Sequence, residues 1–322
     1  MKKIIVFSFL TLILLAGCET QNVSQNDTVE PGEEKIVIAA TFYPLAEFAK
    51  HVGGDLVEVS QVIPSGAEPH EYEPTAKDIT RIYSAGIFLV NGANLDTWAE
   101  KITEELEQKD VRVIVMSDHI KLLTSEEEDE DHDESEAREE ADTHSHIGAD
   151  PHFWLDPLNA VKEVELIRDA LIELDPSNKS VYETNALAYM TQLGNLDEEY
   201  KTGLSDCARA EIITSHSAFG YLADRYGFTQ YGISGISPQE EPGARKIAQL
   251  ADMAKEKNIK YIFFETLVSP RLAETLADEA GAQTLLLHPI GGLTNEDVIA
   301  GKNYVTLMRE NLESLKIALE CR

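Results

Sequence analysis

The sequence predicts an α/β protein with two lobes, each containing a parallel sheet, joined by one long helix. Eight short apolar segments rich in β-branched residues occur in two groups of four, and most of them are separated by segments with helical periodicity. This alternation is typical of parallel strands that helices cover on both faces. Between the two groups, apolar residues and tyrosines recur in steps of three and four residues, as on one face of a helix.

The predicted strands of the first lobe are residues 35–41, 56–63, 85–92 and 111–117, and those of the second lobe are residues 210–217, 230–236, 260–266 and 283–289. A helix is expected from Pro44 to the stop signal Gly53-Gly54. The stripe of the connecting helix comprises Tyr182, Ala186, Tyr189, Leu193, Leu196 and Tyr200. A helix of about 24 residues spans roughly 36 Å, so we expect a rigid connector. Gly194 weakens it by about 1 kcal/mol relative to Ala.

The N-terminus has the pattern of an export signal. Lys2 and Lys3 precede an apolar run from Ile4 to Leu15, which is too short for the roughly 20 residues of a membrane-spanning helix. The small residues before Cys18 resemble a bacterial lipobox, in which the cysteine is acylated and becomes the mature N-terminus. We therefore expect a signal peptide at residues 1–17 and a lipid anchor on Cys18. The alternative is an ordinary cleaved signal with a chance cysteine.

The remaining chain divides by composition. We expect a flexible tether at residues 18–34, an N-terminal lobe at 35–178, a linker helix at 179–205 and a C-terminal lobe at 206–322. Within the first lobe, residues 125–148 lack apolar periodicity and are dominated by charge, which predicts a solvated, disordered loop. The net charge of -31 argues against a nucleic-acid partner, since phosphate binding needs basic surface. We expect a monomer.

Two cysteines remain once Cys18 is assigned to the lipobox. An even number in an exported chain suggests a disulfide between Cys207 and Cys321. On the chain-entropy model, such a bridge constrains the unfolded state by about 4 to 5 kcal/mol. A metal-ligand role for the pair is the weaker alternative, because neither cysteine lies near another cysteine or a histidine at ligand spacing.

Three of the nine histidines have similar surroundings. His70 lies in the loop after one predicted strand, His216 at the C-terminal end of another, and His152 before a new helix. Ligands of open α/β sheets bind at the carboxyl ends of strands, so these side chains are expected to face the crevice between the lobes. Three neutral imidazoles suit zinc or another borderline transition metal. For each residue alone, a hydrogen-bonded structural role is the alternative.

The other histidines outside the acidic loop give weaker signals. We interpret His51 and His119 as structural, whereas His288 is compatible with either the core or the cleft.

Six segments together characterise the chain from Lys35 to Arg322: "TFYPLAEFAKHVGGD", "VIPSGAEPHEYEPT", "NGANLDTWAEKI", "DPHFWLDP", "SHSAFGYLADRYGF" and "EEPGARKIAQL". In these segments and their order, the chain resembles the metal-specific solute-binding proteins of ABC importers, the cluster A-I family, and within it the zinc-uptake branch. The resemblance implies two Rossmann-like lobes joined by one long helix, with a metal held between them by His70, His152 and His216. The manganese-selective branch usually has Glu at the position of His216, and imidazole shifts preference toward zinc.

The chain departs from this family at one expected ligand position. Many relatives have a carboxylate where this chain has Gly291. A fourth ligand would then be water, Glu265 or a loop histidine, in that order, and Glu265 is equally suited to orient an imidazole N–H. The acidic loop contains His132, His144 and His146, which we interpret either as a zinc-capture device or as part of a plain solvated insertion.

The function implied by the resemblance is high-affinity zinc binding outside the cytoplasm, with delivery of Zn(II) to the permease of an ABC importer. The protein is then not an enzyme, and it is lipid-anchored to the cell membrane. Alternatives are a manganese- or iron-binding member of the same family, a zinc-dependent hydrolase and a surface adhesin. Three histidines and an open position also describe a catalytic zinc. However, the sequence has no HExxH motif and no general base paired with a ligand.

Overall fold

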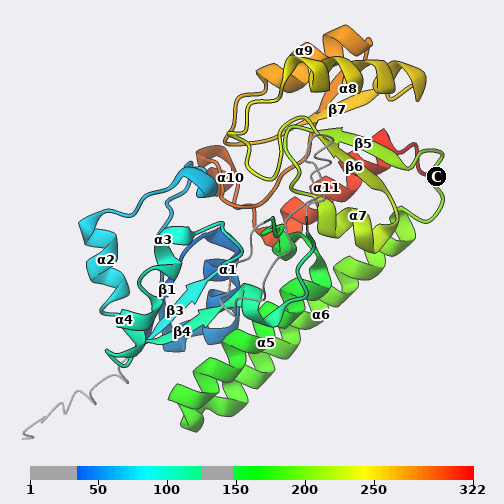
Figure 1. The fold of residues 1–322 in the computed structure, drawn as a ribbon. Coiled ribbons are helices and arrows are strands. Elements are labelled where there is room, and N and C mark those ends of the chain that lie inside the picture. The colour runs from blue at the N-terminus through cyan, green and yellow to red at the C-terminus, as the bar shows by residue number, and fades with distance from the viewer. Residues whose placement is uncertain (1–34, 125–147) are drawn as a thin grey trace, which may run out of the picture. The chain divides into compact units, whose positions relative to one another are not determined.

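The computed structural model describes residues 35–124 and 148–322, which belong to one compact unit that begins at Lys35. Two four-stranded parallel sheets form the centres of two lobes (Figure 1). Within the described residues, no helix has the length and apolar character required to cross a membrane.

The first sheet has the strand order β2-β1-β3-β4, and all its strands are parallel. Its strands are β1 (Ile36–Ala40), β2 (Val57–Gln61), β3 (Ile87–Val90) and β4 (Arg112–Val115). Alternate residues of β1 face opposite sides, so that Ile38 and Ala39 belong to different core clusters. One side is covered by α1 (Tyr43–Gly53) and α5 (Pro157–Leu174), the other by α2 (Ala76–Ile82), α3 (Thr97–Glu100) and α4 (Thr103–Glu107).

The second sheet repeats this topology with the order β6-β5-β7-β8. Its strands are β5 (Glu211–Thr214), β6 (Thr229–Gly232), β7 (Tyr261–Phe264) and β8 (Gln283–Leu286). Helices α8 (Ala244–Glu256) and α9 (Arg271–Ala280) cover one side, and α7 (Gly220–Tyr226) and α11 (Tyr304–Ala318) pack on the other (Figure 1). The short helix α10 (Asn295–Ile299) precedes α11. The prediction of two parallel α/β lobes is confirmed.

Each of the eight strands is shorter than the apolar segment that predicts it, and β6 is an example. The sequence suggests strand character over residues 230–236, but β6 ends at Gly232. A Cβ at Gly232 would lie 2.3 Å from Ser217 Oγ and 2.5 Å from the carbonyl oxygen of Ser234. The chain therefore packs closely around Gly232, and beyond the end of β6 the amides of Ile233 and Ser234 still donate to the carbonyl oxygens of Thr214 and Ser215.

The predicted long helix is present as α6 (Lys179–Gly203), and all six residues of its predicted stripe are buried. It packs along α5 and runs beside both lobes (Figure 1). The Asn185 amide donates to the carbonyl oxygen of Val52 in α1, and the Tyr200 hydroxyl donates to that of Met308 in α11. One core cluster includes residues of both sheets and of α5, α6 and α11. The connector is therefore part of a core that the lobes share.

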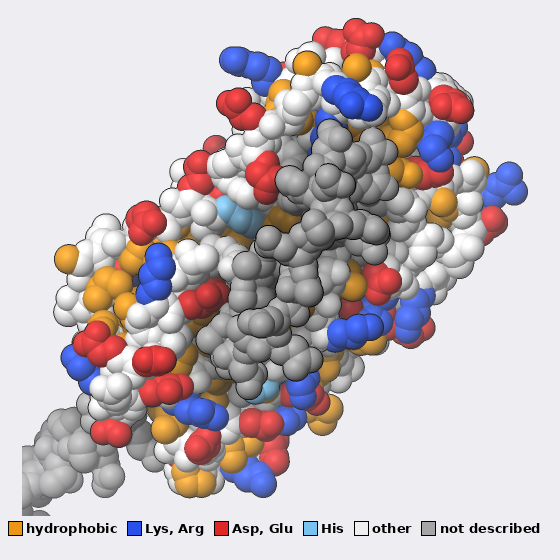
Figure 2. Space-filling view, in the orientation of Figure 1, with side chains coloured by type: hydrophobic (Ala, Val, Ile, Leu, Met, Phe, Trp, Pro, Cys, Tyr) orange, Lys and Arg blue, Asp and Glu red, His pale blue; other side chains and the backbone are white. Residues whose placement is uncertain are grey.

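The C-terminus is attached to the start of the second lobe. A disulfide joins Cys207 and Cys321, as expected, and Arg209 forms an ion pair with Glu320 at 2.7 Å beside it. On the face shown in Figure 2, acidic and basic side chains are interspersed over the described surface. That face has no concentrated basic patch of the kind that phosphate backbones require.

The shared core contains one unusual group, Glu163 of α5, which is fully buried. Neither of its carboxylate oxygens has a hydrogen-bond partner among the described residues. Burial raises the pKa of Glu163 well above its usual range, because an unpaired carboxylate is poorly solvated there. The side chain is therefore expected to be protonated at pH values where a surface glutamate is ionised.

This burial predicts a pH-dependent effect of Glu163→Gln on stability. The pKa of Glu163 is higher in the folded protein than the value of about 4.3 expected in the unfolded chain. Its contribution to the free energy of unfolding is therefore present in full below about pH 4.3 and is lost as pH rises toward the folded pKa. The variant cannot ionise. We expect its free energy of unfolding to match the wild type within about 1 kcal/mol at pH 5 and to exceed it at pH 8.

Urea unfolding at both pH values measures this difference, and Glu165→Gln, in the same helix but partly exposed, is the matched control. A difference between Glu163→Gln and wild type that stays constant from pH 5 to pH 8 would contradict the prediction.

Candidate metal centre

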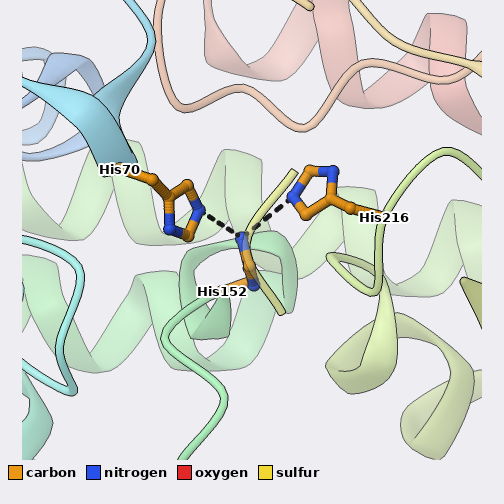
Figure 3. Close-up of side chains that lie close together, drawn as sticks. All are labelled: His70, His152 and His216. Carbon is orange, nitrogen blue, oxygen red and sulfur yellow. Dashed lines mark hydrogen bonds between the residues drawn. The ribbon is translucent and has the colours of Figure 1, made fainter. Parts of the chain in front are cut away.

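Three loops bring His70, His152 and His216 together between the sheets (Figure 3). His70 lies in a single 3-10 turn, Pro69–Glu71, in the segment after β2. His152 immediately precedes the turn Phe153–Leu155, which leads into α5. His216 follows β5 by two residues. All three positions agree with the expected location at the carboxyl ends of strands or at the start of a helix.

Local hydrogen bonds hold each of these loops. The amide of Gly66, which has a positive φ of 85°, donates to the carbonyl oxygen of Leu293 and attaches the His70 loop to the second lobe. The Asn91 side chain donates to the carbonyl oxygen of Pro151, just before His152. The carbonyl oxygen of His216 accepts hydrogen bonds from the Thr214 hydroxyl at 2.7 Å and from the side-chain amide of Gln230 at 2.9 Å.

The imidazoles meet through their Nε2 atoms. Nε2 of His152 lies 3.1 Å from Nε2 of His70 and 3.3 Å from Nε2 of His216. In a tetrahedral zinc site with Zn–N distances near 2.0–2.1 Å, ligand nitrogens are about 3.3 Å apart. These two distances match that spacing, and the candidate ligand atoms of all three rings lie within 4.8 Å of one another, close enough to bind one small cation.

Carboxylates lie behind two of the three rings. Oδ1 of Asp150 is 2.8 Å from Nδ1 of His152 and also accepts from the His152 amide at 2.9 Å. Oε2 of Glu265 makes a close polar contact with Nδ1 of His216, and its Oε1 accepts from the His216 amide at 3.0 Å. A carboxylate at Nδ1 fixes the ring orientation and leaves the Nε2 lone pair free for a metal.

Burial and these carboxylates set the protonation of the rings. Burial, with smaller contributions from neighbouring imidazoles, lowers the pKa values of His70 and His152 well below their ordinary value. Burial acts in the same direction on His216, but the carboxylates of Glu265, Glu68 and Asp150 together outweigh it, and the pKa of His216 is raised. Burial also raises the pKa of Asp150 to about 7, against the stabilising hydrogen bond from the His152 amide. His70 and His152 are thus neutral rings, ready to bind a cation.

The cavity at the three rings has a volume of about 20 Å³. It is also lined by Glu68, Trp154 and Gly291. A single water molecule needs roughly 10–15 Å³ on this measure. The cavity therefore accepts an ion with one additional small ligand, and it is too small for a peptide, ester or sugar substrate.

The fourth coordination position receives no side chain from residue 291. A Cβ at Gly291 would lie 3.0 Å from Cγ of Pro69, so this segment packs directly against the His70 turn. Both oxygens of Glu265 contact His216, a geometry that favours the orienting role over direct ligation. Within the described residues, the group of side chains close enough to bind one ion consists of the three histidines.

Several predicted residues lie elsewhere. The sequence was compatible with His288 in either the core or the cleft, and the structure places it in the core. There its backbone amide donates to Oδ1 of Asn311, and the side-chain amide of Asn311 donates to the His288 carbonyl oxygen. Cys18, His132, His144 and His146 lie outside the described residues.

Sequence reasoning missed the role of Asp150. An Asp two residues before a turn residue commonly accepts a hydrogen bond from that residue's amide, so the pair Asp150 and His152 carried a usable local signal. Trp154 had no such signal, because its Nε1 donates to the carbonyl oxygen of Pro289, 135 residues away.

Comparison with known proteins agrees with this geometry. Residues 38–318 match the model of the family described as "Zinc-uptake complex component A periplasmic" (ZnuA). The chain belongs to the ZnuA family.

Two curated members of the ZnuA family illustrate the similarity. The chain is 42% identical over 317 residues to "Zinc-binding lipoprotein AdcA" of Streptococcus pneumoniae strain R6, covering 98% of this chain but 61% of AdcA. It is 40% identical over 307 residues to "High-affinity zinc uptake system protein ZnuA" of Bacillus subtilis, covering 95% of this chain and 94% of that protein. The chain thus spans about three fifths of AdcA and nearly all of the Bacillus protein.

Solved structures of ZnuA-like proteins have the same fold. The Zn(II)-bound ZnuA-like domain of Streptococcus pneumoniae AdcA superposes with a TM-score of 0.75 at 40% identity, covering 89% of this chain and all of that domain. The laminin-binding protein Lmb of Streptococcus agalactiae, described as having adhesin and metal-transporting activity, superposes with a TM-score of 0.75 at 33% identity and the same coverage.

Proposed function

We propose that this protein is an extracytoplasmic, high-affinity zinc-binding protein that captures Zn(II) between its lobes and delivers it to the permease of an ABC importer. The observation that carries the proposal is the convergence of three imidazole Nε2 atoms at 3.1 and 3.3 Å. Neutral imidazole is a preferred ligand of zinc. Membership of the ZnuA family and the names of the zinc-binding relatives support this choice of cargo.

In this proposal His70, His152 and His216 are the protein ligands of Zn(II). Asp150 and Glu265 act from behind, by fixing the orientation of His152 and His216. Water is the proposed fourth ligand, because Gly291 supplies no side chain and the cavity has room for one small molecule.

Competing functions are less well supported by the site. A manganese site is expected to contain harder oxygen ligands, whereas the three converging groups here are nitrogens. A hydrolase must admit its substrate beside the metal, and a cavity of about 20 Å³ does not. We therefore propose that the protein is not an enzyme. Adhesin activity is described for Lmb, and we do not propose it for this chain.

The cellular setting is part of the same proposal. The signal-like segment 1–17 and the lipobox at Cys18 support export and lipid anchoring, and one relative is named a lipoprotein. An anchored binding protein keeps its captured zinc close to a membrane-embedded permease. The monomeric state and the division into tether, lobes and linker remain predictions.

The proposal predicts one tight Zn(II) per chain and its loss in ligand variants. His70→Ala, His152→Ala and His216→Ala each remove one of three protein ligands, so calorimetry should show affinity reduced by at least about 100-fold, beyond the usual 10–100-fold effect of an outer residue. His119→Ala, which changes a histidine outside the site, is the matched control. Unchanged affinity in all three ligand variants would contradict the assignment.

Zinc affinity is expected to fall as pH decreases from 8 to 5. Each ring must be neutral to bind the metal, so protons compete with zinc. His216 has a raised pKa, and its protonation should compete at pH values above the ordinary 6.5, whereas His70 and His152 compete only at lower pH. Competition titrations across this range test the sign, and a constant affinity would indicate a different ligand set.

Deleting residues 126–146 should leave the tight site intact, because its three histidines lie outside the deleted segment. We expect one zinc per chain with affinity within about threefold of wild type, and a loss only of weak additional zinc binding to the acidic loop. Calorimetry on the deletion variant and on full-length protein measures both classes of site. Loss of the tight site would show that a loop histidine is a ligand.

A further inference from the structure

The hydroxyl of Tyr221 lies between two neighbouring backbone segments, one at Leu123 and one at Asp150, close to the three histidines. Leu123 and Asp150 lie opposite each other, next to the antiparallel bridge between Thr124 and Ala149. Such a pair normally exchanges two N–H···O bonds. Here the Asp150 amide donates to the Leu123 carbonyl oxygen at 2.8 Å. The reciprocal bond, from the Leu123 amide to the Asp150 carbonyl oxygen, is replaced by two bonds to the Tyr221 hydroxyl, which lies between these groups.

The hydroxyl satisfies both groups that the missing bond would have joined. It accepts from the Leu123 amide at 2.9 Å and donates to the Asp150 carbonyl oxygen at 2.9 Å. Tyr221 is buried, and it belongs to α7, which follows β5 in the second lobe. A helix of the second lobe is therefore hydrogen-bonded to both segments that flank residues 125–147.

The same helix also touches the Asp150 side chain. A Cβ at Gly220 would lie 2.7 Å from Oδ2 of Asp150, a separation that real Cβ contacts do not show. The other oxygen of this carboxylate, Oδ1, contacts the backbone amide and Nδ1 of His152. Asp150 is thus held by α7 at its carbonyl oxygen, confined by α7 at Oδ2, and joined to His152 at Oδ1.

We propose that Tyr221 is a positioning residue of the metal site, whose hydroxyl fixes the backbone of Asp150 and thereby the orientation of the His152 imidazole. The inference rests on the proposed zinc-binding function and deepens it. It assigns α7, which supplies no ligand, a role in setting metal affinity.

Removing the hydroxyl has a definite structural consequence. Tyr221→Phe leaves a partly buried amide at Leu123 and a buried carbonyl at Asp150 without their partner, and unsatisfied buried groups are strongly disfavoured. The two segments can recover a hydrogen bond only by closing on each other, which displaces Asp150 from its position behind His152. Loss of the partner that orients a metal-binding histidine typically weakens metal affinity 10- to 100-fold.

The first test compares Tyr221→Phe with Tyr226→Phe. Tyr226 is in the same helix, and its hydroxyl donates to Oδ1 of Asp197 in α6 at 3.1 Å, away from any histidine of the site. Zinc affinity is measured by chelator competition, Co(II) absorption reports coordination geometry, and thermal unfolding of the metal-free protein reports stability. We expect Tyr221→Phe to weaken zinc binding at least tenfold and to alter the Co(II) spectrum. Tyr226→Phe should lower thermal stability while keeping affinity within about twofold.

A second pair of variants reaches Asp150 without changing Tyr221. Gly220→Ala should also weaken zinc binding about tenfold, because the new methyl group displaces the Asp150 carboxylate. Gly194→Ala in α6 has open space around the added methyl group and should bind zinc like the wild type. If Tyr221→Phe does not fold, Gly220→Ala decides the question.

The inference is overturned if Tyr221→Phe and Gly220→Ala bind zinc with wild-type affinity and spectrum, or if Tyr226→Phe weakens binding equally. These outcomes are distinct from failure of the proposed function, in which wild-type protein itself would bind no zinc tightly.

Discussion

Three imidazoles approach one another through their Nε2 atoms, and two of the three rings are held from behind by a buried carboxylate. Asp150 fixes His152, and Glu265 fixes His216, each through Nδ1 and through the backbone amide of the same histidine. The double contact restrains both the ring and the main chain, and so the arrangement of the cluster depends on two buried acidic residues behind it.

The site also depends on the lobes sharing a core. Trp154, two residues after His152, donates through Nε1 to the carbonyl oxygen of Pro289 in the second lobe. The hydroxyl of Tyr304, at the start of α11, donates to the carbonyl oxygen of Trp154. Because the segment after His152 is attached to the second lobe at two points, the position of His152 is coupled to the packing of the two lobes.

Buried acidic groups of this protein differ in their hydrogen-bond partners. At Asp150 and Glu265 burial is accompanied by a hydrogen bond from a histidine backbone amide, and each carboxylate also contacts Nδ1 of that histidine. At Glu163 the carboxylate has no partner among the described residues, and burial favours its protonated form. The same residue type thus has a positioning role near the cavity and contributes a neutral polar group to the core between α5 and its neighbours.

The sequence by itself determined the two parallel α/β lobes, the long helix with its buried stripe, and the Cys207–Cys321 disulfide. These follow from periodicity, composition and cysteine number, which are local or compositional signals. It also placed His70, His152 and His216 at loop positions facing one edge of each sheet. The distances between them, the carboxylate behind each of two rings and the closeness of Gly291 to Pro69 required the tertiary structure. Contacts such as Trp154 with Pro289 or Tyr221 with Leu123 join residues about 100 or more positions apart, and no local pattern specifies which distant loops will meet.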